Sequence, residues 1–123
     1  MTWILIALGG AAGAMSRYAV DTFVAERVGV AFPFGTMLIN VSGSFILGLL
    51  FALAMERGVL TPEIRPGLII GFLGAYTTFS TWMLQSWGLI EQGAWISAGM
   101  NIVGSVVLGL IAVVAGLAVG RAI

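Results

Sequence analysis

Four hydroxyl side chains fall within five consecutive positions of a stretch that carries no charge. They are Thr77, Thr78, Ser80 and Thr81, and the uncharged stretch runs from Pro66 to Ile90. Hydroxyl groups can hold an ion or a polar solute through hydrogen bonds, and none of them is a titratable carrier. In hydrocarbon, irregular chain survives only where it is buried or lines a wet cavity. A polar break in the middle of a membrane span is therefore the best pointer in this sequence to an ion or substrate site.

The composition places the chain in a membrane. Of its 123 residues, 60% are apolar and 8% are charged, and the mean hydropathy is +1.13, whereas soluble proteins carry roughly 25% charged residues. The chain has no cysteine and no histidine, which removes thiol nucleophiles and the usual zinc or iron ligands. Without a visible nucleophile, base or metal site, an enzyme is not expected. The net charge is zero and there is no basic block, so nucleic acid is not an expected partner.

Charged residues divide the chain into four apolar blocks, each expected to form a membrane-spanning helix. The expected spans are about residues 3–20, 34–55, 66–90 and 94–120. About 20 helical residues cross the hydrocarbon layer, so the first block is marginal and the others are long enough. Arg17, near the end of the first block, would reach toward the headgroups or pair with Asp21. We therefore predict a single domain, residues 1–123, an all-α membrane protein of four transmembrane helices. The third helix would be broken at mid-membrane, and both termini would lie on the same side.

The arginines barely favour one orientation of these helices. Arg57, Arg65 and Arg121 would lie on the side of the termini, and Arg17 and Arg27 on the other. This difference is too small for the positive-inside rule to set the orientation firmly. Two outcomes stay open. One is a charge-poor protein oriented by its first helix, and the other is dual topology, in which the same chain inserts both ways and pairs antiparallel.

The second and fourth spans each carry a stripe of small residues that favours close helix packing. Each stripe contains an asparagine, Asn40 in the second span and Asn101 in the fourth. A buried carboxamide is costly unless it is hydrogen-bonded. Either these amides link neighbouring helices, or their N–H groups face an anion.

Four motifs, one in each expected span, occur in an order that is typical of a known family. They are Gly13–Arg17, Asn40-x-x-Gly43, Gly71–Thr81 and Gly104–Ser105. Over essentially the whole chain they resemble the Fluc (CrcB-type) fluoride channels. The resemblance implies a passive fluoride-selective channel that exports fluoride and protects the cell from its toxicity, in the plasma membrane of a prokaryote. It also implies an antiparallel dual-topology dimer, with two pores along the subunit interface and a structural sodium ion on the two-fold axis.

The resemblance also assigns roles to individual residues. Gly74 and Thr77 match the positions whose backbone carbonyls hold the sodium ion, and Arg17 matches the family's arginine near the end of the first helix. Gly74 has no Cβ, so its carbonyl could turn toward the dimer axis; alternatively, this glycine only permits a close helix crossing. The pore would be lined by polar and aromatic side chains, namely those of Asn40, Phe79, Ser80, Thr81, Trp82, Asn101 and Ser105.

Physical chemistry makes such a pore reasonable. Fluoride is small and strongly hydrated, so a selective path must replace its water with other hydrogen-bond donors. Hydroxyl and amide groups can do this, and the positive edge of an aromatic ring can assist them. A fixed cation along the path would hold the ion too tightly for it to leave.

Two positions depart from the family pattern. The family usually has a second phenylalanine three residues after Phe79, where this chain has Trp82, which adds bulk and an N–H donor. Gln85 stands where many members carry a glutamate, so a charge-dependent role there is in doubt. Some members work as pairs of unlike subunits, so the chain could also be the partner subunit of a heterodimeric fluoride channel.

Two functions of other classes fit the size of the chain. A small four-helix multidrug exporter requires a carboxylate in mid-membrane to exchange protons for cationic drugs. The acids of this chain all lie near span ends or in loops, at Asp21, Glu26, Glu56, Glu63 and Glu91. A purely structural membrane subunit would use the Thr77–Thr81 string only to kink a helix. Fluoride efflux from liposomes, with chloride as the control, would separate these functions from a channel.

Overall fold

The apolar blocks fold into four long helical stretches. They are Thr2–Val28, Phe34–Glu56, Pro66–Glu91 and Trp95–Ala122, each long and apolar enough to cross a membrane. The computed structural model describes all residues, 1–123, and contains no strand. The prediction of an all-helical chain with four helices of spanning length is therefore confirmed.

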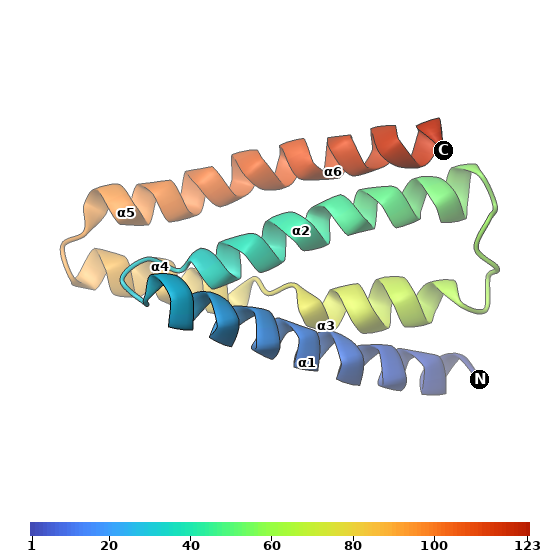
Figure 1. Cartoon of the computed structure of the whole chain (residues 1–123), viewed down its shortest axis with the longest axis horizontal. Helices are drawn as coiled ribbons and strands as arrows, with labels where there is room; N and C mark the ends of the chain where they lie inside the picture. Colours follow the sequence, from blue (N-terminus) through green and yellow to red (C-terminus); the bar gives the residue numbers. More distant parts are fainter.

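The helices alternate in direction, so the connections gather at two ends (Figure 1). Both termini and the connection of residues 57–65 lie at one end. The connections of residues 29–33 and 92–94 lie at the other.

The first helix, α1 (Thr2–Val28), continues well past the expected end near Val20. It stops at Gly29, whose φ of 80° is a left-handed conformation that glycine adopts without strain.

One of the two extensive helix contacts joins α2 (Phe34–Phe51) to α6 (Ser105–Ala122). Small residues permit it, as the stripe in each span indicated. A Cβ on Gly116 would overlap the carbonyl oxygen of Phe45, and one on Gly48 would overlap that of Val113. The backbones of α2 and α6 are therefore in direct contact. In lipid, where the hydrophobic effect does not favour helix association, such close packing is what holds helices together.

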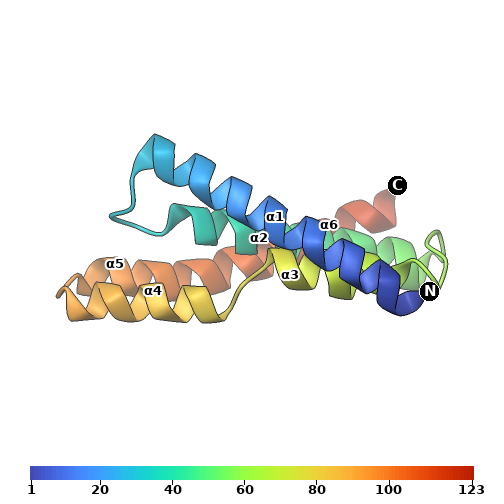
Figure 2. The same ribbon diagram turned by 90° about the horizontal axis from the view of Figure 1, so that it is seen from below.

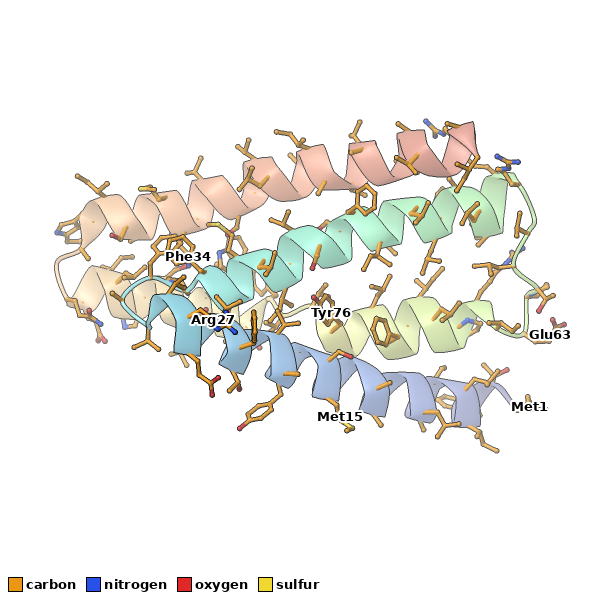
Figure 3. All side chains as sticks on the ribbon, viewed as in Figure 1. Met1, Met15, Arg27, Phe34, Glu63 and Tyr76 are labelled. Carbon is orange, nitrogen blue, oxygen red and sulfur yellow. The ribbon has the colours of Figure 1, made fainter.

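The second long contact joins α1 to the first half of the third span, η2 (Pro66–Leu73) and α3 (Gly74–Tyr76). Here Gly13 lies against the carbonyl of Phe72. Between the two helix pairs lies a small apolar core of Ile39, Leu73 and Tyr76. Figure 3 shows Tyr76 inside the bundle and Met15 projecting away from it.

The third span is interrupted. Residues 77–79 are not helical, and the second half continues as α4 (Ser80–Glu91). Figure 2 shows the extended chain that separates α3 from α4. The fourth span also departs from a regular helix, because the π-helical turn η3 (Met100–Gly104) separates α5 (Trp95–Gly99) from α6. Two other segments are also π-helical, namely η2 in the third span and η1 (Ala52–Glu56), which ends the second span.

Most of the charged residues lie near the ends of the bundle, whereas Arg17 lies within α1. The one ion pair joins Glu56 and Arg121 at 2.7 Å, at the end that holds the termini. Of the two possibilities for Arg17, pairing with Asp21 is not observed, because no ion pair joins them. Asp21 instead packs against Gly35, in the first turn of α2, where the helix dipole favours a negative charge.

Candidate functional site

The break in the third span is held by one side chain from α2. The Thr78 backbone N–H donates to Asn40 Oδ1 at 2.8 Å, and Asn40 Nδ2 donates to the Thr78 carbonyl at 2.9 Å. Thr77, just before it, has extended backbone (φ −79°, ψ 157°). The carboxamide thus replaces backbone partners that the break removes. The sequence left two roles open for Asn40, linking helices or facing an anion. Asn40 links two helices, and its second amide hydrogen is not used in doing so.

Two backbone carbonyls at the break accept no hydrogen bond. In a continuous helix, the N–H of Thr78 would bond to the carbonyl of Gly74, and the N–H of Thr81 to that of Thr77. Here the first N–H goes to Asn40 and the second to the hydroxyl of Thr78, at 3.4 Å. Both oxygens are therefore available to another ligand, and they belong to the residues expected to hold a cation.

Gly74 does not serve a helix crossing within the chain. Its backbone is ordinary right-handed helix (φ −62°, ψ −35°). The nearest atom to a Cβ placed there would be the Ile69 carbonyl oxygen, at 3.9 Å. Gly74 is exposed. Neither backbone strain nor a close neighbour in the same chain therefore requires a glycine at this position.

The second half of the span begins with unpaired donors. The backbone N–H groups of Phe79 and Trp82 have no acceptor. The hydroxyl of Thr78, one residue before the N-cap Phe79, accepts from the Thr81 N–H and donates to the Thr81 hydroxyl at 3.1 Å, so it partners one N–H of the first turn of α4. Free N–H groups and the helix dipole together give this end a partial positive charge. Such a helix end attracts anions.

An aromatic pair stands beside these donors. The rings of Phe79 and Trp82 meet edge to face, with centroids 5.6 Å apart and planes at 73°. The indole Nε1 of Trp82 donates to the Asn101 carbonyl at 3.0 Å. Phe79 is 70% exposed, so within one chain its ring has an aromatic neighbour on one side only.

An open groove of about 560 Å³ brings many of these residues together. It runs along α2, the broken third span and α6, and no charged side chain lines it. Among the expected site residues, the groove is lined by Asn40, Gly74, Thr77, Phe79, Trp82 and Ser105. The Ser105 hydroxyl has no hydrogen-bond partner. Apolar side chains such as Leu47 and Val113 make up much of the remaining wall.

Other expected site residues lie outside the groove. Ser80 and Thr81 are exposed on the first turn of α4, and Arg17 is half-buried on α1. Asn101 is completely buried, and its Nδ2 donates to Ser86 Oγ at 2.9 Å. Gln85 faces a separate cavity of about 270 Å³, which Asp21 also lines.

Two groove residues had no role assigned from the sequence. Thr78 is the hydrogen-bonding centre of the break, and its position just before a helix is typical of a capping residue. Gly43 lies one turn after Asn40 and packs against the Thr77 methyl group, which a Cβ on Gly43 would overlap. The spacing of Asn40 and Gly43 on one helix face was the signal for this contact.

Comparison with known proteins shows the family of this chain. Residues 4–117 match the family described as "CrcB-like protein, Camphor Resistance (CrcB)". The chain is 44% identical, over 119 residues, to a protein of Trichormus variabilis named "Fluoride-specific ion channel FluC", covering 96% of this chain and 87% of that one. It is 45% identical to a protein of the same name from Magnetococcus marinus, covering 96% of each. It is 46% identical to "Fluoride-specific ion channel FluC 1" of Symbiobacterium thermophilum, covering 98% of each. A match of this extent and identity shows that the chain belongs to the CrcB-like family.

Proposed function

We propose that this protein is a passive, fluoride-selective ion channel that exports fluoride and so protects the cell from its toxicity. The observation that carries the proposal is the groove at the broken third span, where unpaired hydrogen-bond donors stand in an otherwise apolar and uncharged wall. The relatives named as fluoride-specific channels support the choice of ion. The fold, the neutral groove and the family all favour a channel over an enzyme.

The donors around the groove suit a small anion. They are the N–H groups of Phe79 and Trp82, the second amide hydrogen of Asn40 and the hydroxyl of Ser105. Together they can replace much of the water around a fluoride ion, and the edge of the Phe79 ring adds a weak positive partner. Because no arginine lines the groove, nothing holds the ion too strongly for conduction. Ser80, Thr81 and Asn101 would extend the polar path, and Arg17 would lie at its vestibule.

We place the working channel in a dimer. The groove is open along one side, and Phe79, Ser80 and Thr81 are exposed beside it. Hydroxyl groups facing lipid would be costly, so a second chain is a better neighbour for this surface. The nearly balanced arginines favour insertion both ways, which makes that neighbour an antiparallel copy of the same chain. In this arrangement the break lies near mid-membrane, and two pores run along the subunit interface.

A sodium ion at the two-fold axis fits the unpaired carbonyls. Gly74 and Thr77 each present an oxygen without a donor. Two chains would supply four such oxygens and no carboxylate, which suits a monovalent hard cation better than calcium or magnesium. Its fixed positive charge would lower the cost of an anion passing nearby.

The membrane is the plasma membrane of a prokaryote, in keeping with the organisms of the relatives. An exporter of cationic drugs is not favoured, because the groove contains no acid.

The deciding experiment is fluoride efflux from liposomes that contain this protein alone, with chloride as the matched control. We expect fluoride efflux without a proton gradient and strong rejection of chloride. Equal chloride efflux, or a requirement for a proton gradient, would contradict the proposal. Activity only with an unlike partner would identify a heterodimeric channel.

A further inference from the structure

Ser105 differs from the other buried or half-buried serines in the helices around the break. A serine or threonine in a helix commonly donates to the carbonyl four residues earlier. Ser44 and Ser86 do so at 2.7 and 2.8 Å, and Thr77, directly after α3, makes the same bond at 2.9 Å. Ser105 does not, although the residue is only 8% exposed and lines the groove, and its hydroxyl oxygen is buried without a partner. Its hydroxyl is a free donor in an apolar wall.

The carbonyl that Ser105 would use already has a donor from another helix. It belongs to Asn101, and it accepts both the backbone N–H of Ser105 and the indole N–H of Trp82, the latter at 3.0 Å, so both of its lone pairs are used. The Asn101 side chain then donates to the Ser86 hydroxyl at 2.9 Å, which donates to the Trp82 carbonyl at 2.8 Å. These three bonds form a closed ring between α4 and the π-helical turn Met100–Gly104.

We propose that Trp82 is a positioning residue that acts through Ser105. Its indole N–H occupies the Asn101 carbonyl, and this leaves the Ser105 hydroxyl free to donate to the anion in the groove. The inference rests on the proposed fluoride function. It gives the indole nitrogen a role that is separate from that of the ring, because a phenylalanine at position 82 would keep an aromatic edge beside Phe79 while losing the N–H and some bulk.

The first test uses fluoride efflux from liposomes with Trp82→Phe, Ser105→Ala and the double variant. Each single change should lower the fluoride rate about threefold to tenfold, as expected for one lost hydrogen bond. The double variant should be no slower than Ser105→Ala, since both changes remove the same donor. Trp87→Phe is the matched control, because Trp87 is an exposed tryptophan of the same helix with no hydrogen bond. An unchanged rate in Trp82→Phe, or a double variant slowed by the product of the two effects, would overturn the proposal.

The second test does not depend on conduction. A high-resolution structure of Trp82→Phe should show the Ser105 hydroxyl turned to within ~3 Å of the Asn101 carbonyl oxygen. A hydroxyl that still faces the groove would show that the π-helical turn alone orients it, and would overturn the role of Trp82. If the unaltered protein fails to conduct fluoride, the proposed function fails, and this structural comparison still decides the hydrogen-bond relationship.

Discussion

The Asn40 carboxamide forms two hydrogen bonds with the backbone of Thr78, one to its N–H and one to its carbonyl, at 2.8 and 2.9 Å. The side-chain amide of Asn40 offers Thr78 one acceptor and one donor, as a backbone peptide group would. It lets the third span leave helical geometry without exposing both groups of Thr78. It also explains why the carbonyl of Gly74 has no donor, because its usual partner is the N–H that Asn40 takes.

Replacing Asn40 should therefore damage both the fold and conduction. In Asn40→Ala, two polar groups of Thr78 lose their partners, at a cost of about 1 to 3 kcal/mol for each group that stays buried. We expect a lower unfolding temperature in detergent and loss of most fluoride efflux. Ser44→Ala is the control, because it removes only the bond from Ser44 to the Asn40 carbonyl. A fully active and stable Asn40→Ala protein would remove Asn40 from the site.

The Phe79 ring should matter for conduction and not for folding. It is 70% exposed within the chain and contributes little to the core. Phe79→Ile keeps an apolar side chain and removes the aromatic edge, so we expect fluoride efflux to fall about tenfold, equivalent to ~1.4 kcal/mol. Size-exclusion chromatography should show an unchanged assembly. An unaltered efflux rate would mean that Phe79 only packs against Trp82.

Part of this site followed from residue types alone. Long apolar blocks without charge predict helices, because a helix satisfies its backbone hydrogen bonds within the segment itself. The cluster of hydroxyls marked the break, because a polar interruption of an apolar span is typical of irregular chain that is buried or lines a wet cavity. The pairing of Asn40 with Thr78 did not follow, since it depends on how α2 is rotated against α3. The bond from Trp82 to Asn101 did not follow either, because it meets a π-helical turn that no residue pattern announced.

Close contact between α2 and α6 gives a prediction about stability. A side chain on Gly116 would overlap the Phe45 carbonyl, so Gly116→Leu must push the two helices apart. We expect a destabilisation of about 1 to 3 kcal/mol, measured as a lower unfolding temperature. Gly99→Ala is the control, because Gly99 is exposed, lies in a helix and has open space around its Cα. Equal stability of both variants would show that α2 and α6 do not pack in this way.

The orientation of the chain can be fixed by charge. Val59→Lys with Thr61→Lys adds two positive charges to the connection 57–65, where both residues are exposed. The positive-inside rule should then allow one orientation only. Expressed alone, this variant should form no antiparallel dimer and show no fluoride efflux.

A partner variant should rescue it. Val30→Lys with Ala31→Lys places the same charges at the opposite end, on exposed residues, and co-expression should restore efflux. Val59→Ser with Thr61→Ser controls for the substitutions themselves. Full activity of the first lysine variant on its own would rule out dual topology.

The sodium site gives the most specific test of the dimer. Within one chain a Cβ on Gly74 meets nothing closer than 3.9 Å, and Gly10 has the same nearest distance, to the carbonyl of Gly71. Gly74→Ala and Gly10→Ala should therefore fold equally well as single chains. Only Gly74→Ala should weaken the dimer and lower fluoride efflux, because its new methyl group would crowd the two-fold axis.

In the unaltered protein, efflux should also fall when a large organic cation replaces sodium. A high-resolution map should show one ion on the axis, ~2.2 to 2.5 Å from the carbonyl oxygens of Gly74 and Thr77. Side-chain carbons at that point, or an empty axis, would contradict the cation site. The groove would remain a candidate anion path in that case, because its donors belong to Asn40, Phe79, Trp82 and Ser105 and do not depend on the cation.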